Sequence, residues 1–530
     1  MKGCIQMKLD EFIKKQNEKM EKLHITYSNA SWKTATTGEE EWSEKTAEAG
    51  LKYKQYFSDP QLFEQVKEFL KEDIKDPLHK RQLDILYSNL LENQLPEETL
   101  RELVKLSTEL NSTFNTFRAS IKGKQVSEND VRQILVNSND LTEREEAWHA
   151  SKQIGAEVEE KLLKLIKKRN EGARALGYAN HHQMAFELQE LDRDFVFSTF
   201  KELKKLSDEP FREVKREIDE ELAERFNIQL KDLRPWHYAD PFFQEAPKLK
   251  GLDLDPEYKG KNIEQITIET FKAMGLEITH LVKNSDLYPR EKKNQHAFMS
   301  NLNRSGDIRV LCNINESSYW METMLHEFGH AIYDDSVDPE LPFSLRKYAH
   351  ILSTEAIAMY YGRMGKNPDW LEKFLGMDKA KLEELTPELD KAMLRQMLIA
   401  ARWIMTFSFF ERELYENPDQ DLNQLWWKIV EEVQFVNPPD NMDYPHWAAK
   451  IHFCIAPVYY QNYLLGELTA SQLHHFIEEN VSKDMFSKEV GEFLNNNYFF
   501  HGGRFEWNEK IEKVTGEKLN PAHFVTQFMK

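Results

Sequence analysis

The sequence predicts a mainly α-helical protein with one small antiparallel sheet. Glu, Lys, Leu and Gln recur at helical spacing along most of the 530 residues, and only 20 glycines and 19 prolines interrupt them. With 40% apolar and 12% aromatic residues, the chain can build a sizeable core. We expect residues 1–530 to form a single domain made of two helical halves.

Helices are predicted where apolar residues recur with a period near 3.6. They lie near residues 7–23, 39–57, 60–72, 96–121, 140–178, 192–226 and 262–275. Asp140 or Thr142 is the expected N-cap of the longest early helix. Residues 27–32 (YSNASW) are expected to form a polar turn after the first helix. Residues 234–260, which are rich in proline and glycine, are expected to connect the two halves.

One region has the alternation of a β-strand. Residues 307–312 (DIRVLC) alternate apolar and polar side chains, and their partner is expected within residues 294–302. Helical spacing returns at residues 318–334, opened near Ser317. The small sheet is therefore expected beside this helix.

The composition excludes several kinds of partner. The formal net charge of −20 lacks the positive field that nucleic-acid binding needs, and it repels anionic membranes. No apolar run approaches the roughly 18 residues of a membrane span, and the first residues lack the pattern of a signal peptide. Three widely spaced cysteines argue against a disulfide framework. We expect a cytoplasmic protein that binds neither nucleic acid nor membranes.

Residues 326–330 read HEFGH, an instance of His-Glu-x-x-His. His326 and His330 are one helical turn apart on the same face, so they can bind one metal ion together. Glu327 is rotated by roughly 100° from His326 and can accept a proton from a metal-bound water. Zinc peptidases use this arrangement, although so short a pattern also arises by chance.

A zinc enzyme needs a third protein ligand besides two histidines. Glu355 lies in LSTEAIAM, a helical stretch whose other residues are apolar or small. Burying an acid in such a stretch costs free energy unless the acid is paired or binds a metal. The alternative is that Glu355 is a carboxylate on an exposed face of the helix. His350 is a second candidate for the third ligand; a structural role, or a role in supporting a ligand, is about as well indicated. With Glu355 as the third ligand, we expect one Zn²⁺ per chain, bound by His326, His330 and Glu355.

These residues carry a family resemblance. HEFGH followed by Ser-Thr-Glu355-Ala-Ile-Ala resembles the metal-binding segment of the angiotensin-converting-enzyme-like peptidases, and it is similar to the thimet oligopeptidase and oligoendopeptidase F group. The segments at residues 27–32, 423–428 (NQLWWK), 449–452 (AKIH) and 506–524 extend the resemblance along nearly the whole chain.

The resemblance implies a fold and a substrate class. It implies an ellipsoid split by a deep cleft, with zinc at its floor and N-terminal lid helices at about residues 1–100. The substrates are short, unstructured peptides, because folded proteins do not enter such a cleft. The converting enzymes remove C-terminal dipeptides, whereas the oligopeptidases cut inside short peptides.

The resemblance also implies roles for single residues. His326, His330 and Glu355 match the zinc ligands, and Glu327 matches the general base. His452 matches the histidine that stabilises the tetrahedral intermediate.

Further positions match residues that contact the substrate. Tyr463 matches the oxyanion donor, and Lys450 matches the lysine that receives a substrate C-terminal carboxylate. Tyr460 matches a second carboxylate contact, with Tyr459 as a rival because the spacing is one residue longer than expected. His296-Ala297 resembles the histidine and edge strand that contact the substrate backbone.

Three positions depart from the converting enzymes. Asn462 replaces an arginine, which puts chloride activation in doubt. Gln295 replaces the cysteine that would pair with Cys312. Met359 replaces an acid four residues after the glutamate ligand, so another group is expected to orient a metal-binding histidine.

The function predicted from the sequence is that of a zinc metallopeptidase acting on short peptides, in a peptidyl-dipeptidase or an oligoendopeptidase mode. A catalytically inactive, peptide-binding relative is the alternative, and a non-peptidase zinc hydrolase is a weaker one. The complete set of His326, Glu327, His330 and Glu355 argues against the inactive relative.

Overall fold

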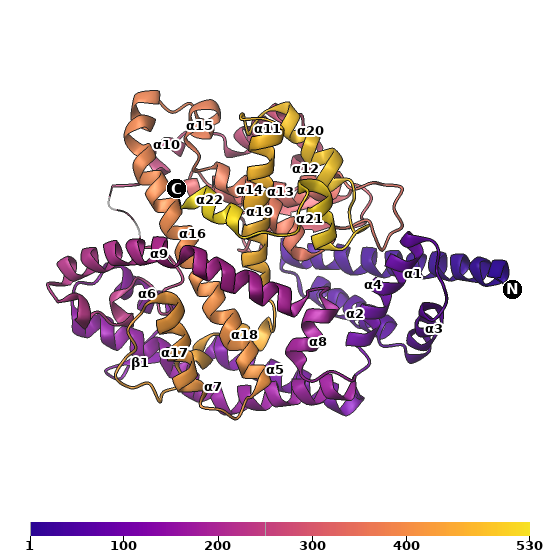
Figure 1. The fold of residues 1–530 in the computed structure, drawn as a ribbon, viewed down its shortest axis with the longest axis horizontal. Coiled ribbons are helices and arrows are strands. Elements are labelled where there is room, and N and C mark those ends of the chain that lie inside the picture. Colours follow the sequence, from indigo (N-terminus) through magenta and orange to yellow (C-terminus); the bar gives the residue numbers. More distant parts are fainter. Residues whose placement is uncertain (1, 248, 250, 530) are drawn as a thin grey trace. The chain divides into compact units, whose positions relative to one another are not determined.

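The computed structural model describes residues 2–247, 249 and 251–529, with side chains from residue 8 onward (Figure 1). The fold is mainly α-helical, as predicted, with two antiparallel sheets of two strands each. Two compact units form. Unit 1 comprises Met1–Gln94, Leu252–Leu389 and Leu465–His523, and unit 2 comprises Leu95–Gly251, Asp390–Leu464 and Phe524–Lys530.

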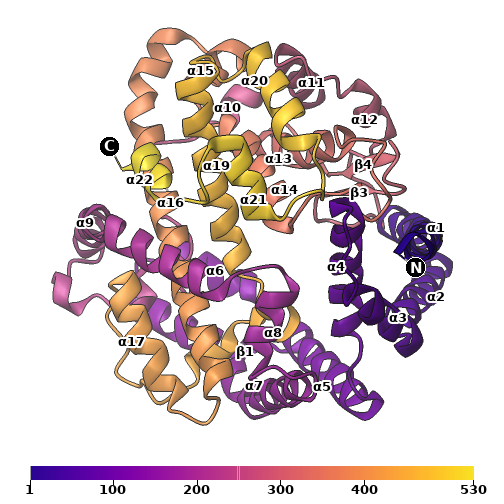
Figure 2. The ribbon, with the colours of Figure 1, turned by 45° about the vertical axis from the view of Figure 1, so that its right-hand side comes forward.

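Unit 1 contains the N-terminal helices and both strands of the predicted sheet. Its elements are α1 (Lys2–Thr37), α2 (Glu40–Phe57), α3 (Pro60–Leu70), α4 (Pro77–Glu92), α10 (Asp255–Tyr258), α11 (Ile263–Ala273), α12 (Thr279–Asn284), β3 (Phe298–Asn301), β4 (Ile308–Leu311), α13 (Ser318–Asp335), α14 (Ile351–Met364), α15 (Pro368–Trp370), η3 (Leu371–Leu375), α20 (Lys488–Phe493), η5 (Leu494–Phe499) and α21 (Trp507–Thr515). In Figure 2, α1 to α4 lie together, and α13 lies beside β3, β4 and α14.

Unit 2 is built around long helices. Its elements are α5 (Glu97–Thr116), β1 (Ala119–Ile121), β2 (Lys124–Val126), α6 (Glu128–Asn137), α7 (Leu141–Ala175), α8 (His181–Leu188), α9 (Arg193–Phe226), η1 (Leu230–Asp232), η2 (Pro235–His237), α17 (Leu422–Gln434), η4 (His446–Ala449) and α18 (His452–Ile455). Three further helices contain residues of both units: α16 (Lys379–Glu416), α19 (Gln461–Asn480) and α22 (Ala522–Phe528).

The start of the chain differs from the prediction. The expected polar turn at residues 27–32 is part of α1, which continues to Thr37. Polar side chains there fit the helix because they donate to carbonyls four residues earlier, as Asn29 does to Ile25. Trp32 anchors this part of α1 in a cluster with Leu302 and Leu311. Tertiary packing therefore overrides the local preference for a turn.

The end of the predicted helix at residues 96–121 is also different. Helix α5 ends at Thr116, and a hairpin of β1 and β2 follows. Lys122 and Gly123 between the strands both have positive φ, the conformation that matches the twist of a two-residue hairpin.

The region around the metal motif agrees with the sequence. Ser317 caps α13 by accepting the backbone N–H of Trp320, and β3 pairs antiparallel with β4 from Phe298–Leu311 to Asn301–Ile308. Helix α13 packs on both strands, so the small sheet lies beside the predicted metal helix. None of the helices in the described part of the chain is long and apolar enough to cross a bilayer.

Candidate active site

The side chains of His326, His330 and Glu355 meet between α13 and α14 in unit 1. Glu355 Oε2 lies 3.9 Å from Nε2 of His326 and 3.9 Å from Nε2 of His330. Within the described residues, these three are the group of His, Cys, Asp or Glu side chains that could hold a metal ion. A tetrahedral zinc with bonds of about 2.0–2.2 Å keeps its ligand atoms roughly 3.5 Å apart, so small side-chain movements close the site around an ion.

Small residues let the helices approach closely at this point. A Cβ atom on Gly329 of α13 would lie 3.1 Å from Ala358 Cα on α14. A Cβ on Gly466 of α19 would lie 3.4 Å from Glu355 Cβ. The absence of side chains at both glycines therefore sets the distance between Glu355 and the two histidines.

The histidines are oriented by groups on α14. His330 Nδ1 lies 2.7 Å from Thr354 Oγ1, and the His326 ring is hydrogen-bonded to the backbone of Ala358. These contacts leave the two Nε2 atoms directed at Glu355. Thr354 and the backbone of Ala358 therefore orient the two histidines. This is the role for which another group was expected, because Met359 stands where the converting enzymes have an acid.

Burial favours the protonation states that suit a metal. It lowers the pKa of His326 to about 4 and lowers that of His330 as well, so both imidazoles are neutral at physiological pH. Neutral imidazole is the form that binds metals. Burial also raises the pKa of Glu355 to about 7, and a cation beside it would favour its charged form.

Glu327 lies on α13 next to the ligands and is 7% exposed. The backbone N–H of Met299, in β3, donates a hydrogen bond to its carboxylate. Burial, together with the charge of Glu355, raises the pKa of Glu327 to about 8. A carboxyl group whose pKa lies near neutrality is suited to accept a proton and return it.

His350 is the N-cap of α14 and is not part of the metal cluster. Its Nδ1 accepts the backbone N–H of Leu352 at 3.1 Å. Burial lowers its pKa to about 3. Of the two roles that the sequence left open for His350, the structure therefore supports the structural one.

His296 and Ala297 lie immediately before β3. His296 is exposed, and Ala297 is half-buried against the core of unit 1. The strand that follows supplies the Met299 N–H to Glu327. Cys312, at the end of β4, is a buried free thiol, in agreement with Gln295 in place of its partner cysteine.

Lys450, the C-cap of η4, belongs to a second group of predicted residues, all in unit 2. Its Nζ donates to Gln244 Oε1 at 2.7 Å and lies 5.0 Å from the ring of Trp403 and 5.8 Å from the ring of Tyr460. Burial lowers the pKa of Lys450 to about 8, and the charge of Asp240 partly offsets this effect. The result is a cation held in an aromatic enclosure.

His452 and Tyr460 lie side by side in the same unit. Their ring centroids are 5.0 Å apart, and the Tyr460 hydroxyl accepts Trp403 Nε1–H at 2.8 Å. Burial lowers the pKa of His452 to about 4, so this imidazole is neutral. Tyr463, at the start of α19, is 5.4 Å from Tyr460 and from Tyr459. The ring of Tyr460 thus lies beside both Lys450 and His452.

Asn462 is buried beside these tyrosines. Its Nδ2 donates to Gln189 Oε1 at 3.0 Å, so a neutral amide pair occupies the position where an arginine was expected from the converting enzymes.

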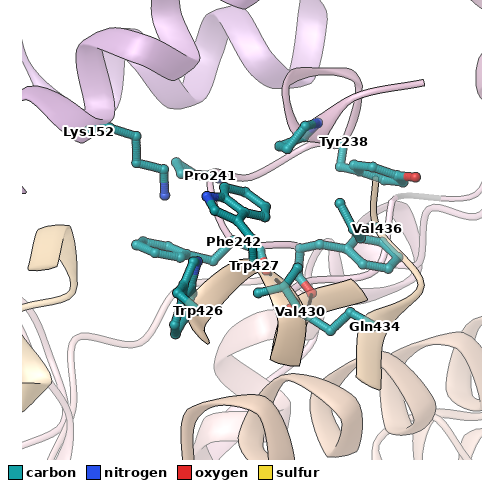
Figure 3. A pocket seen from close by; sticks show the side chains of 11 residues that line it. Lys152, Tyr238, Pro241, Phe242, Trp426, Trp427, Val430, Gln434 and Val436 are labelled. Carbon is teal, nitrogen blue, oxygen red and sulfur yellow. Dashed lines mark hydrogen bonds between the residues drawn. The ribbon is translucent and has the colours of Figure 1, made fainter. Parts of the chain in front are cut away.

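A small aromatic cavity adjoins the Lys450 enclosure in unit 2 (Figure 3). Its volume is about 20 Å³, room for one water molecule. Lys152, which is 1% exposed, lies at its wall with its Nζ 3.2 Å from the ring centroid of Phe242. Burial lowers the pKa of Lys152 far below its usual value.

Sequence reasoning missed Gln244, Phe242 and Lys152. The first two lie in residues 234–260, where the prolines indicated only a connection. The third lies on the long helix α7, where a lysine indicates a solvated face. The one signal in the sequence is Asp240, an acid followed at once by proline and two aromatic residues, which accepts the backbone N–H groups of Phe242 and Gln244.

The mainly helical fold and the His-His-Glu cluster built on His-Glu-x-x-His define the class of the metallopeptidases. A family model described as "Peptidase family M3" matches residues 134–530, and one described as "Angiotensin-converting enzyme" matches residues 5–237. The chain belongs to peptidase family M3, which confirms the resemblance seen in the sequence.

A curated relative supports the same class. Carboxypeptidase 1 of Bacillus subtilis (strain 168) is 24% identical over 262 residues, which are 43% of this chain and 51% of the relative. The chain thus matches about half the length of that relative.

Proposed function

We propose that this protein is a zinc-dependent metallopeptidase that hydrolyses short, unstructured peptides in the cytoplasm and has neither nucleic acid nor membrane as a partner. The observation that carries the proposal is the convergence of His326, His330 and Glu355 next to the buried Glu327. Two neutral imidazoles and one carboxylate match the donor set of catalytic zinc sites.

Zinc in this site would lower the pKa of a bound water to about 7 and polarise the scissile carbonyl. Glu327 is the general base in our proposal. It accepts the proton of the attacking water and passes it to the leaving amine. Its raised pKa suits this cycle, because the protonated carboxyl group is stable long enough to act as an acid.

We assign stabilisation of the tetrahedral oxyanion to His452 and Tyr463. Both carry a donor on a ring that is held by aromatic packing. A neutral imidazole donates one N–H, and a phenol donates its O–H. Such a preorganised donor typically contributes about 3–4 kcal/mol to the stabilisation of the transition state.

Lys450 receives the substrate's C-terminal carboxylate in this proposal. Gln244 holds the ammonium group, and the ring of Tyr460 lies beside it. An ammonium–carboxylate hydrogen bond is stronger than a neutral one, and the aromatic enclosure strengthens it further. The site favours a peptidyl-dipeptidase or carboxypeptidase mode over an oligoendopeptidase mode, and the name of the Bacillus relative agrees with this preference. His296 and Ala297 would guide the extended substrate along the strand β3.

Replacement of Glu327 by Gln tests the mechanism. The change removes the proton acceptor but leaves the metal ligands intact. We expect zinc content to stay unchanged and kcat to fall at least roughly a hundredfold, the scale of general-base loss. Zinc analysis and peptide hydrolysis, followed by mass spectrometry, give both quantities. Wild-type turnover in this variant would rule out Glu327 as the base.

A set of peptides with free or amidated C-termini tests the substrate mode on the zinc-loaded protein. Release of a C-terminal fragment of fixed length that stops on amidation supports the role of Lys450. Cuts at no fixed distance from either end support the oligoendopeptidase mode. If the zinc-loaded protein cuts none of the peptides but binds them, the inactive relative is the correct alternative.

A further inference from the structure

The segment between His452 and Tyr463 contains a strained residue. Val458 has φ of 52° and is completely buried. A β-branched side chain in this left-handed region clashes with its own backbone, so Val458 is a true outlier. Such strain persists only where surrounding groups hold the backbone in place.

The strongest of these groups is the carboxyl group of Glu411, on α16. Its Oε1 accepts the backbone N–H of Val458 at 2.9 Å. Glu411 is 1% exposed, and burial raises its pKa to about 8. An acid in so apolar a place costs stability, and the mechanism proposed above makes no use of it.

Amide groups hold Val458 from the other side. Its carbonyl accepts Nε2–H of Gln189 at 3.0 Å and Nε2–H of Gln461 at 2.8 Å. The peptide groups on both sides of the strained residue therefore have buried side-chain partners.

The start of the segment is held by a buried cation. Arg169 donates to the carbonyls of Phe453 at 2.7 Å and Cys454 at 2.6 Å. With that end of the segment fixed, the strained turn at Val458 determines the positions of Tyr460 and Tyr463.

We propose that Glu411 is a positioning residue that holds the strained backbone of Val458 and thereby fixes the turn between His452 and Tyr463. The inference rests on the proposed function, because it gains its meaning from the roles of those two residues. Without the acceptor at Glu411 Oε1, Val458 relaxes to a conformation with negative φ. The side chains of Tyr460 and Tyr463, which follow the turn, then move from their positions. The role requires an acceptor at this point and does not require a charge.

Kinetics of variants at these two positions test the proposal. Glu411→Met fills the same space without an acceptor, and we expect kcat to fall at least about tenfold with KM changed by less than threefold, since the loss of one whole oxyanion donor costs about a hundredfold. Glu411→Gln keeps an acceptor and should keep kcat within about threefold. Combining Glu411→Met with Val458→Gly should restore kcat, because glycine adopts positive φ without strain.

Other outcomes would overturn the proposal. They are wild-type kcat in Glu411→Met, loss of kcat in a folded Glu411→Gln, or failure of Val458→Gly to rescue. If Glu411→Met does not fold, as judged by thermal unfolding, the Glu411→Gln result still decides. Ser408→Ala, a buried change one turn earlier on α16, is the control. His452→Phe and Tyr463→Phe separate the two hypotheses: full activity in both refutes their proposed roles, independently of Glu411.

Discussion

Lys450 is a residue of the proposed substrate site whose charge changes close to physiological pH. Its pKa is about 8 because burial disfavours the ammonium form, while Asp240 and Glu245 partly compensate. A carboxylate pairs with the charged form alone. The folded protein therefore holds the binding cation below pH 8 and loses it as the pH rises through that value.

We expect the KM of a peptide with a free C-terminus to rise above about pH 8, by up to tenfold for each further pH unit as the charged fraction falls. The amidated peptide should not show this rise. Lys450→Arg is the control, because a guanidinium stays charged throughout this range. The same pH profile in Lys450→Arg and in the wild type would assign the rise to another group.

Thr354 is the second residue with a role that can be isolated. Its hydroxyl oxygen is the partner of His330 Nδ1, and it fixes the orientation of the ring. Thr354→Val keeps the shape of the side chain and removes this partner. We expect zinc affinity to fall about tenfold, the lower end of the range for such outer partners.

Zinc affinity of Thr354→Val is measured by competition with a chromophoric chelator, with no need for activity. The neighbouring Ser353→Ala is the matched control, since the buried Ser353 hydroxyl has no hydrogen-bond partner among the described residues. An unchanged zinc affinity in Thr354→Val would show that packing alone orients His330.

The residues of the metal cluster were predictable because they follow from spacing along helices. His326, Glu327 and His330 lie within five residues, and Glu355 stands out as an acid among apolar neighbours. Thr354 was not predictable, because nothing in its local sequence distinguishes it from other threonines in helices. Gln244 approaches Lys450 only through the tertiary fold, across 206 residues of sequence.

At the scale of elements, capping and periodicity predicted α7, α9 and α13 within a few residues. Asp140 caps α7 as expected, and α13 begins at Ser318 as expected. Periodicity failed where polar side chains bond to their own helix, as in α1. It also failed at the hairpin of β1 and β2, whose strands of three residues each are too short to show alternation.

The crossing of α13 and α14 at Gly329 is the element contact on which the metal site depends. A Cβ atom there would lie 3.1 Å from both Ala358 Cα and Tyr361 Cδ2. Gly329→Val should push the helices apart and move Glu355 away from the histidines. We expect a loss of about 1–3 kcal/mol in the free energy of unfolding, the usual cost of overpacking, together with weaker zinc binding.

Denaturant unfolding and chelator competition measure the two effects of Gly329→Val. Gly362→Ala on α14 is the control, because its added Cβ would meet its nearest neighbour, His326 Cβ, at 3.5 Å, an ordinary contact. Loss of stability with unchanged zinc affinity would show that the helix spacing does not set the metal site.

At the scale of the whole molecule, the two groups of proposed site residues belong to different compact units. The metal ligands and Glu327 are in unit 1, whereas Lys450, His452 and Tyr463 are in unit 2. Each unit is assembled from three separate stretches of the chain, and short-range patterns do not reveal such an assembly. The cleft implied by the resemblance therefore stays a prediction.

The positions of the proposed ligands predict which part of the folded chain zinc stabilises. All three proposed ligands lie in unit 1, so the free energy of zinc binding should oppose local unfolding of that unit first. At a free zinc concentration of 1,000 times Kd, the stabilisation is about 4 kcal/mol. In hydrogen-exchange mass spectrometry of the whole protein, zinc should slow exchange most in α13 and α14. Exchange in α7 and α9 of unit 2 should change little.

Glu355→Ala is the control for this experiment, because it removes one ligand and should abolish the slowing at matched zinc concentrations. The two units respond in different ways only if they open separately, so the result also measures their coupling. Equal slowing in both units would mean that they unfold together and that zinc stabilises the chain as one body. Slowing confined to α7 and α9 would contradict the assignment of His326, His330 and Glu355 as the ligands.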